Sequence, residues 1–138
     1  MFDHCIYFNT MALSRQLDRI WTEAFKPFDL TPAQAFTLRA TLNKPGMLQS
    51  ELAQTLHIAR ATATRAIDGL EKRGLLLRRA SRNDKRECEI HPTVEALKLQ
   101  ASLDEASAAM SSHLRSELGD RFFSDFVDHA KCISKQIS

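Results

Sequence analysis

Arginine and hydroxyl side chains gather between residues 60 and 65, where the sequence reads Arg-Ala-Thr-Ala-Thr-Arg. An Arg side chain can donate two parallel hydrogen bonds to guanine in the major groove of DNA, and Thr can bond or contact base edges. Small residues between them suit insertion into the groove. The stretch therefore predicts a segment that reads DNA sequence, and its expected contacts are Arg60, Ala61, Thr62, Thr64 and Arg65.

A second group of cations lies in the turn-rich segment 81–86, Ser-Arg-Asn-Asp-Lys-Arg, and we expect Arg82, Lys85 and Arg86 to contact DNA. Asp84 precedes Arg86 by two residues, so at a hairpin tip the two side chains can lie on the same side and pair. Pairing would direct Arg86 into a narrow minor groove, where negative potential is enhanced. In the alternative reading, Asp84 only forms the turn and Arg86 contacts a phosphate.

Hydrophobic spacing predicts that the first group lies on a helix. Ala63, Ala66, Ile67 and Leu70 follow the i, i+3, i+4, i+7 spacing of one buried stripe, which leaves the Arg and Thr side chains on the opposite face. Gly74 ends this helix after a basic pair.

A shorter helix is expected just before it, at 49–56, with Leu52, Ala53 and Leu56 facing inward. Gln49 and Ser50, at its start, complete the predicted DNA contacts. After Gly74, residues 75–79 and 86–91 read as two strands of a hairpin around the basic tip. A helix-turn-helix followed by a basic hairpin is a winged helix.

The flanking segments read as further helices. One is expected from about Asp3 to Lys26, and the next begins with Thr31 as N-cap and Pro32 in the first turn. After Pro92 the helical pattern returns, and Gly119-Asp120 interrupts it. The apolar residues expected on one side of this helix are Leu97, Leu103, Met110, Leu114 and Leu118.

We therefore predict a mainly α fold with a small β-hairpin wing in a single chain, 1–138. Residues 30–92 form a winged helix DNA-binding lobe, and residues 1–29 and 93–138 supply dimerisation helices. These helices carry more apolar residues than one lobe of this size can cover, which favours pairing with a second copy. The alternative is that they fold back on their own lobe.

Charge is uneven along the chain, although the net charge is only +2. Residues 57–86 hold nine of the 19 Lys and Arg residues but only three of the 17 Asp and Glu residues. Positive charge is thus concentrated on the expected DNA-facing segment, as phosphate binding requires.

Four motifs, in this order and spacing, resemble the MarR family of bacterial transcriptional regulators. They are residues 30–34 (LTPAQ), 49–53 (QSELA), 62–75 (TATRAIDGLEKRGL) and 84–86 (DKR). In that family the arginine matching Arg86 enters the minor groove, and the aspartate matching Asp84 braces it. The chain departs from the family pattern after the wing, at 92–96, and at two helix starts, where Leu48 and Ala59 replace polar residues.

The resemblance implies a homodimeric, sequence-specific regulator of transcription that binds a pseudo-palindromic operator in double-stranded DNA. We expect a repressor that a small-molecule effector releases by shifting the distance between the two DNA-reading helices. Arg15, on the first helix, is the candidate for meeting an anionic effector; its alternative role is a surface salt bridge.

Cysteine chemistry offers an alternative mode of control. Cys5 follows His4 near the start of the first helix, and a helix N-terminus and a protonated His both favour the thiolate. Some MarR relatives sense peroxide through a cysteine in this helix, so a redox-sensing regulator is one alternative. An ordinary cysteine at an interface is the other.

Other functions find less support in the sequence. His129 and Cys132 share a helical face, but a structural zinc site requires about four ligands, so we expect no metal and no cofactor. Enzymatic motifs are missing. Neither a signal-peptide pattern nor a membrane-spanning run is present, and three cysteines without framework spacing suit a cytoplasmic protein. A winged helix that binds proteins instead of DNA remains as a rival, although it does not require cations on both helix and wing.

Overall fold

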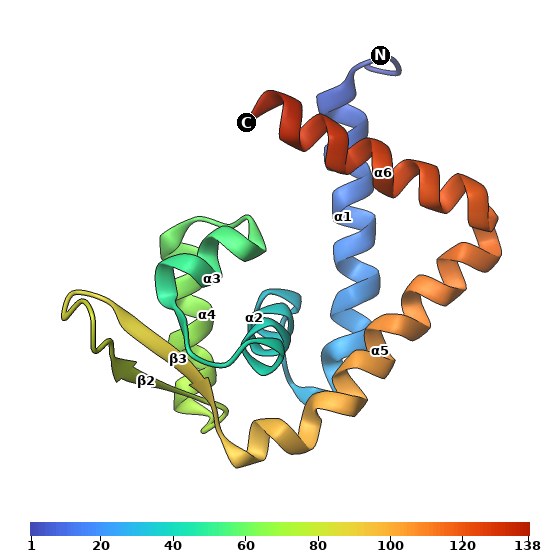
Figure 1. The fold of residues 1–138 in the computed structure, drawn as a ribbon. Helices are drawn as coiled ribbons and strands as arrows, with labels where there is room; N and C mark the ends of the chain where they lie inside the picture. Colours follow the sequence, from blue (N-terminus) through green and yellow to red (C-terminus); the bar gives the residue numbers. More distant parts are fainter.

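A computed structural model describes residues 1–138 and contains six α-helices, one 3-10 turn and three strands. In chain order these are α1 (Ile6–Phe25), η1 (Lys26–Phe28), α2 (Pro32–Asn43), β1 (Met47–Leu48), α3 (Gln49–Leu56), α4 (Arg60–Lys72), β2 (Leu76–Ala80), β3 (Cys88–Pro92), α5 (Val94–Leu118) and α6 (Asp120–Ile137). The segment from α2 to β3 forms one lobe, and the long helices α1, α5 and α6 extend from it as arms (Figure 1). The predicted fold class, a mainly α winged helix-turn-helix, is confirmed.

The wing belongs to a three-stranded antiparallel sheet with the order β1-β3-β2. β2 and β3 form the expected hairpin, in which Arg78 lies opposite Ile90. The extra strand, β1, pairs Met47 with Ile90. The sequence did not predict β1, because two residues are too few to show the alternation of a strand.

Both strands of the hairpin begin later than predicted. β2 starts at Leu76, one residue after the expected position. The second strand starts at Cys88 and not at Arg86. The later start of β3 has its reason in the tip, where the backbone N–H of Glu87 donates to the carbonyl of Asp84 and extends the turn.

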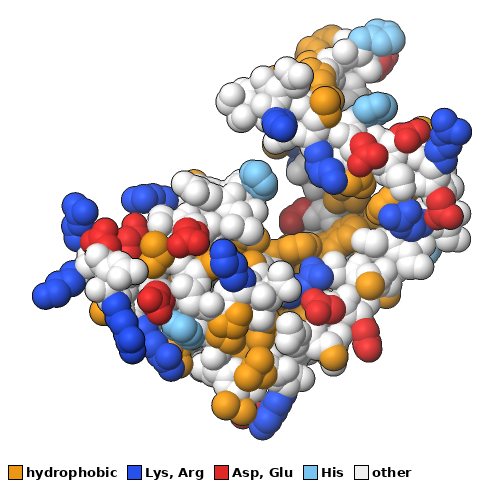
Figure 2. All heavy atoms as spheres, viewed as in Figure 1, with side chains coloured by type: hydrophobic (Ala, Val, Ile, Leu, Met, Phe, Trp, Pro, Cys, Tyr) orange, Lys and Arg blue, Asp and Glu red, His pale blue; other side chains and the backbone are white.

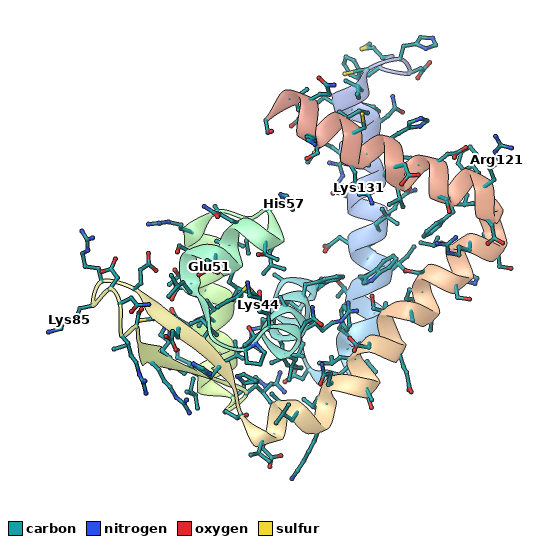
Figure 3. All side chains as sticks on the ribbon, viewed as in Figure 1. Lys44, Glu51, His57, Lys85, Arg121 and Lys131 are labelled. Atoms are coloured by element: carbon teal, nitrogen blue, oxygen red, sulfur yellow. The ribbon has the colours of Figure 1, made fainter.

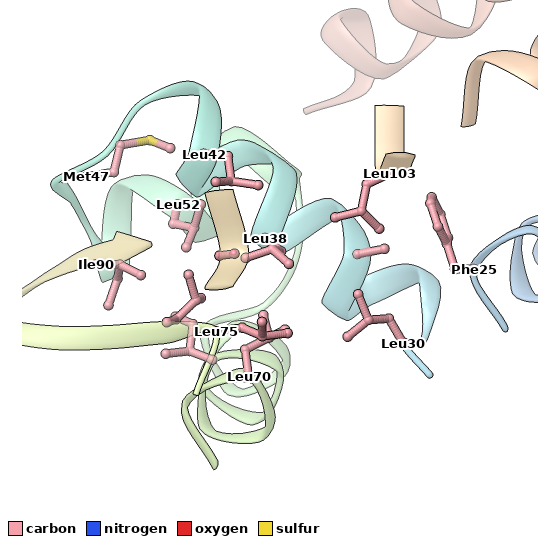
Figure 4. Packing of buried hydrophobic residues seen from close by; sticks show 14 residues of the cluster. Phe25, Leu30, Leu38, Leu42, Met47, Leu52, Leu70, Leu75, Ile90 and Leu103 are labelled. Carbon is pink, nitrogen blue, oxygen red and sulfur yellow. The ribbon is translucent and has the colours of Figure 1, made fainter. Parts of the chain in front are cut away.

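The buried stripe predicted for α4 is confirmed, and it consists of Ala63, Ala66, Ile67 and Leu70. Ile67 and Leu70 pack with Leu38 of α2 and Leu52 of α3 in the core of the lobe (Figure 4). Burying one such side chain contributes about 1.5–3 kcal/mol. Packing therefore holds α4 in place, since its N-cap, Ala59, makes no side-chain hydrogen bond.

Side-chain caps fix where three other helices begin. α2 starts with the predicted capping box: Thr31 Oγ1 accepts from the N–H of Gln34 at 3.1 Å, and Gln34 Oε1 accepts from the N–H of Thr31 at 3.0 Å. Thr93 caps α5 through the N–H of Ala96. α1 begins at Ile6, after the predicted Asp3, because Cys5 is its N-cap.

The contact between α2 and α4 depends on Gly69. A Cβ built at Gly69 would lie 2.6 Å from Nε2 of Gln34, the same side chain that completes the capping box. Glycine at position 69 thus leaves room for the Gln34 amide, which the capping box holds in place, and lets α2 and α4 approach each other.

An apolar cavity of about 730 Å³ lies between the three arms, and its lining includes Trp21, Leu114 and Phe123. α6 has no buried residue at all. Its exposed hydrophobic residues are Phe122, Phe126, Val127, Ile133 and Ile137. No helix is both long enough and apolar enough to cross a membrane.

One expectation for α5 is wrong. Leu97 was expected on the same side as Leu103, but Leu97 is 53% exposed whereas Leu103 is fully buried. Six residues at about 100° each turn the two side chains about 120° apart, so they cannot share one narrow face.

Candidate nucleic-acid interface

The predicted DNA contacts meet where the N-termini of α3 and α4 face the wing. A hollow of about 250 Å³ opens there, lined by Gln49, Ser50, Arg60, Thr64, Arg86, Glu87 and Cys88. Five of these seven residues are predicted contacts, although they come from three separate segments of the chain. Two helix N-termini and two Arg side chains around one hollow favour the binding of an anion such as a DNA phosphate.

The remaining predicted contacts lie beside this hollow. Ala61 and Arg65 are exposed on the outer face of α4, and Thr62 is half-buried between them. Arg82 and Lys85 are exposed at the tip of the wing, where Lys85 points away from the lobe (Figure 3). The outer face of α4 and the wing tip are thus both accessible, and the hollow lined by Arg60 and Arg86 joins the two elements.

Two of the predicted base contacts use their polar atoms within the protein. Gln49 Nε2 donates to Thr64 Oγ1 at 2.8 Å, and Thr64 Oγ1 donates to the carbonyl of Arg60 at 2.9 Å. These bonds join the first residue of α3 to the first turn of α4. Gln49 and Thr64 therefore help to fix the helix-turn-helix, a role that their residue types alone did not reveal.

Arg78, on β2, is the residue that the sequence analysis missed. Its Nη2 donates to Asp68 Oδ1 at 2.6 Å, its Nη1 to Glu71 Oε1 at 2.8 Å, and its Nε to Gln49 Oε1 at 3.3 Å. Burial lowers the pKa of Arg78. The hydrogen bonds to Asp68 and Glu71 and the attraction of their charges together raise it by more, so the pKa of Arg78 is above its ordinary value. The i, i+3 spacing of two acids on α4 was a visible signal, but nothing in it identified a partner on β2.

The wing tip holds Arg86 by local hydrogen bonds. Asp84 Oδ1 accepts from the backbone N–H of Arg86 at 2.9 Å and from its Nε at 3.3 Å. Chiefly the backbone bond, and then the side-chain bond, lowers the pKa of Asp84 below its ordinary value. Ser81 supports the turn, since its Oγ accepts from the N–H groups of Asn83 and Asp84. The pair predicted from the two-residue spacing is therefore present in the structure.

Not all the cations counted in residues 57–86 are free to meet DNA. Arg73 donates to the carbonyls of Phe28 and Asp29, and so ties the end of α4 to η1. Arg78 is engaged with Asp68 and Glu71. Figure 2 shows Lys and Arg side chains over the wing, on the left of the view, with acidic side chains between them. The DNA-facing positive charge is thus smaller than the sequence count indicated.

The residues considered for control lie on the arms. Arg15 is exposed on α1. It does not line the apolar cavity, which Arg19 borders, nor the groove between α2 and α5, which Arg39 borders. Cys5 is exposed, and its Sγ accepts from the N–H of Phe8 at 3.4 Å.

The residues considered for other chemistry lie in no cluster of metal-ligand side chains and in no disulfide. All three cysteines are free. No group of three or more His, Cys, Asp or Glu side chains is placed to hold a metal ion, so His129 and Cys132 stand without further ligands.

Known proteins share both the sequence pattern and the fold. Residues 28–87 match the family model described as MarR family. The uncharacterized HTH-type transcriptional regulator YybA of Bacillus subtilis (strain 168) is 33% identical over 87 residues, 63% of this chain and 58% of that protein. The putative transcriptional regulatory protein for the hcr operon of Thauera aromatica is 28% identical over 91 residues, 66% of this chain and 55% of that protein. The matches thus span little more than half the length of these curated relatives.

A solved structure extends the likeness to nearly the whole chain. The transcriptional repressor CouR, bound to a 23-mer DNA duplex, superposes with a TM-score of 0.87 at 25% sequence identity. The superposition covers 96% of this chain and 94% of that one. The arms are therefore part of the shared fold, together with the winged helix lobe.

Proposed function

We propose that this chain, whose residues 28–87 match the MarR family model, is a DNA-binding regulator of transcription that reads a pseudo-palindromic operator as a homodimer. The observation that carries this proposal is the joint placement of α4 and the wing. Arg60 and Arg86 line one hollow, Arg65 is exposed on the adjoining helix face, and two helix N-termini add positive potential. In this arrangement α4 enters the major groove and the wing follows the neighbouring minor groove.

The exposed apolar surface of the arms supports the proposed homodimer. α6 leaves every residue unburied although it carries a long hydrophobic stripe, and the N-terminal segment exposes Phe2, Ile6 and Tyr7. An apolar surface of this extent is typical of a protein interface. A second copy of the chain fits it, because self-complementary stripes can pair about a two-fold axis. In this division, residues 30–92 bind DNA, and residues 1–29 and 93–138 dimerise.

An effector acts, in this proposal, between the arms and the lobe, and the regulator is a repressor. Figure 2 shows hydrophobic side chains in the recess between the two parts. A groove nearby, between α2 and α5, contains Arg39, whose guanidinium lies 5.0 Å from the ring centre of Phe36 and pairs with Asp104 at 2.8 Å. A ligand that binds one arrangement of arms and lobe more tightly shifts the separation of the two α4 helices. Arg15 does not line this groove, and its role in anion recognition stays a prediction.

Selection of bound sequences from random double-stranded DNA tests the proposal. The purified protein is expected to enrich a pseudo-palindrome whose half-sites are centred about 10–10.5 bp apart, one turn of the double helix. Failure to enrich any sequence, with only salt-sensitive binding to all DNA, would contradict sequence-specific regulation.

A further inference from the structure

We propose that Arg78 is a positioning residue that holds the wing at a fixed angle to α4, so that Arg86 and Arg65 reach their DNA sites together. This inference rests on the proposed DNA binding. It concerns a side chain that is itself turned inward and is only 22% exposed. Its contribution would be to the alignment of other contacts.

All three guanidinium nitrogens of Arg78 are engaged, each with a different residue. Asp68 and Glu71 lie on the middle and the last turn of α4, and Gln49 is the first residue of α3. Gln49 in turn donates to Thr64 on the first half of α4. One side chain on β2 thus joins the wing to both helices of the helix-turn-helix.

Arg78 is also the last side chain of β2 that binds the lobe before the wing tip. Leu75 and Leu76 are buried against the lobe, but Arg79 and Ala80 are exposed. Beyond Arg78, β3 attaches the hairpin to the lobe, because Glu89 pairs with Leu48 of β1 and Cys88 packs against the core. Loss of Arg78 therefore leaves the outer half of β2 without a side-chain attachment, and the angle of the hairpin to α4 depends on β3 alone.

Lysine is not expected to replace this side chain. A guanidinium presents its donors in a rigid planar fork, whereas an ammonium is a compact point charge on a flexible stem. In an Arg78→Lys variant, the ammonium could satisfy one or two of the three acceptors at a time. Retention of charge alone would then leave the wing loosely held.

A simpler role must be separated from positioning, because Asp68 and Glu71 lie on the exposed side of α4. Without Arg78 their carboxylates would be uncompensated and would repel DNA phosphates. If neutralisation were the whole role of Arg78, then removal of the two acids together with Arg78 would restore DNA binding. Positioning predicts no such recovery, since the outer half of β2 would still lack its side-chain attachment.

A double-mutant cycle measures the positioning directly. The affinity of the full-length dimer for its selected operator is compared among wild type, Arg78→Met, Arg86→Ala and the double variant. In the background that keeps Arg86, Arg78→Met is expected to weaken operator binding about tenfold, because groups in one network couple by roughly 0.5–3 kcal/mol. In the Arg86→Ala background the same change should cost less than about threefold, since a wing without Arg86 has little left to align.

Matched variants complete the design. Arg79→Met removes the neighbouring cation, which makes no ion pair, and its effect should be the same with and without Arg86. Arg78→Met/Asp68→Asn/Glu71→Gln should stay about tenfold weaker than wild type. Thermal unfolding and sedimentation verify that each variant is a folded dimer, and Arg78→Lys enters the same cycle if Arg78→Met does not fold.

The outcomes separate this inference from the proposed function. Equal losses for Arg78 in both backgrounds, or full recovery in the triple variant, would overturn the positioning role while DNA binding by the wild type stands. Absence of any operator binding by the wild type would overturn the proposed function and the positioning role with it.

Discussion

Arg65 is free to read a base, because its only hydrogen bond is a weak one, at 3.4 Å, to Thr62 Oγ1. It lies on the exposed face of α4 in the first half of the helix, the part of a major-groove helix that contacts the bases. Arg65→Ala should therefore cost about 1–3 kcal/mol in operator affinity and relax sequence preference at one position of each half-site. Competition among single-base variants of the selected operator measures both effects.

Lys72 is the matched control for Arg65 on the same helix. It is the last residue of α4 and is exposed, about two turns farther along. Lys72→Ala should weaken binding to all sequences alike, since a cation that meets phosphate carries no base information. If both substitutions reduce affinity without changing sequence preference, α4 has been assigned to the wrong groove contact.

Asp84 is expected to favour DNA binding, although its negative charge would repel phosphate. Its carboxylate accepts two hydrogen bonds from Arg86, and these keep its pKa below the ordinary range. Asp84 therefore stays ionised as pH falls to about its unfolded pKa of 3.9, and the pairing is lost only when pH falls through the lower folded pKa. Asp84→Ala at neutral pH removes a brace that is fully formed there.

Both wing substitutions should weaken operator binding. Arg86→Ala should also lower the slope of log affinity against log salt by about 1. Asp84→Ala should weaken binding although it removes a negative charge, because Arg86 is no longer oriented. A gain in affinity on loss of Asp84 would show that this carboxylate only forms the turn.

At the scale of elements, the contact between α2 and α4 gives a test of packing. Alanine favours a helix over glycine by about 1 kcal/mol, but a Cβ at residue 69 meets the amide of Gln34, which the capping box holds. Gly69→Ala should therefore stabilise a Gln34→Ala variant by roughly 0.5–1 kcal/mol and the wild type by less. Chemical denaturation of the four proteins measures this difference. Equal effects in both backgrounds would mean that Gln34 moves aside freely.

Elements with a strong local signal could be predicted from the sequence. The stripe of α4, the capping box at Thr31 and the break at Gly119 all depend on spacing within one segment, and all were found where expected. Their detection needs no knowledge of the rest of the fold, because helix periodicity and caps are local properties.

Features that depend on distant segments could not be predicted. Arg78 reaches acids on α4, and β1 gains its strand conformation only by pairing with β3. Arg73 was counted as a DNA-facing cation, yet it binds carbonyls more than 40 residues away. Residue type gives the charge of such a side chain, but only the tertiary structure gives its partner.

On the scale of the whole molecule, the proposed dimer covers the apolar side of α6 with a second copy of the chain. Phe126 lies on the exposed apolar side of α6, and a carboxylate there would be buried without a partner in a dimer. Phe126→Glu should therefore shift sedimentation at micromolar concentration from dimer to monomer. Arg121→Glu places the same group on the polar side of α6, where the side chain is 96% exposed, and should leave the dimer intact. A wild type that sediments as a monomer would rule out this architecture.

The most direct test of the central claim is a footprint of the wild-type protein on its selected operator, with guanine methylation in the major groove and sugar cleavage in the minor groove as probes. Two copies of α4 and two wings predict two symmetric patches of guanine protection centred about 10–10.5 bp apart, each with a neighbouring minor-groove protection that disappears in Arg86→Ala. A single unsymmetric patch, or minor-groove protection that survives the loss of Arg86, would contradict a homodimer that reads DNA with α4 and the wing together.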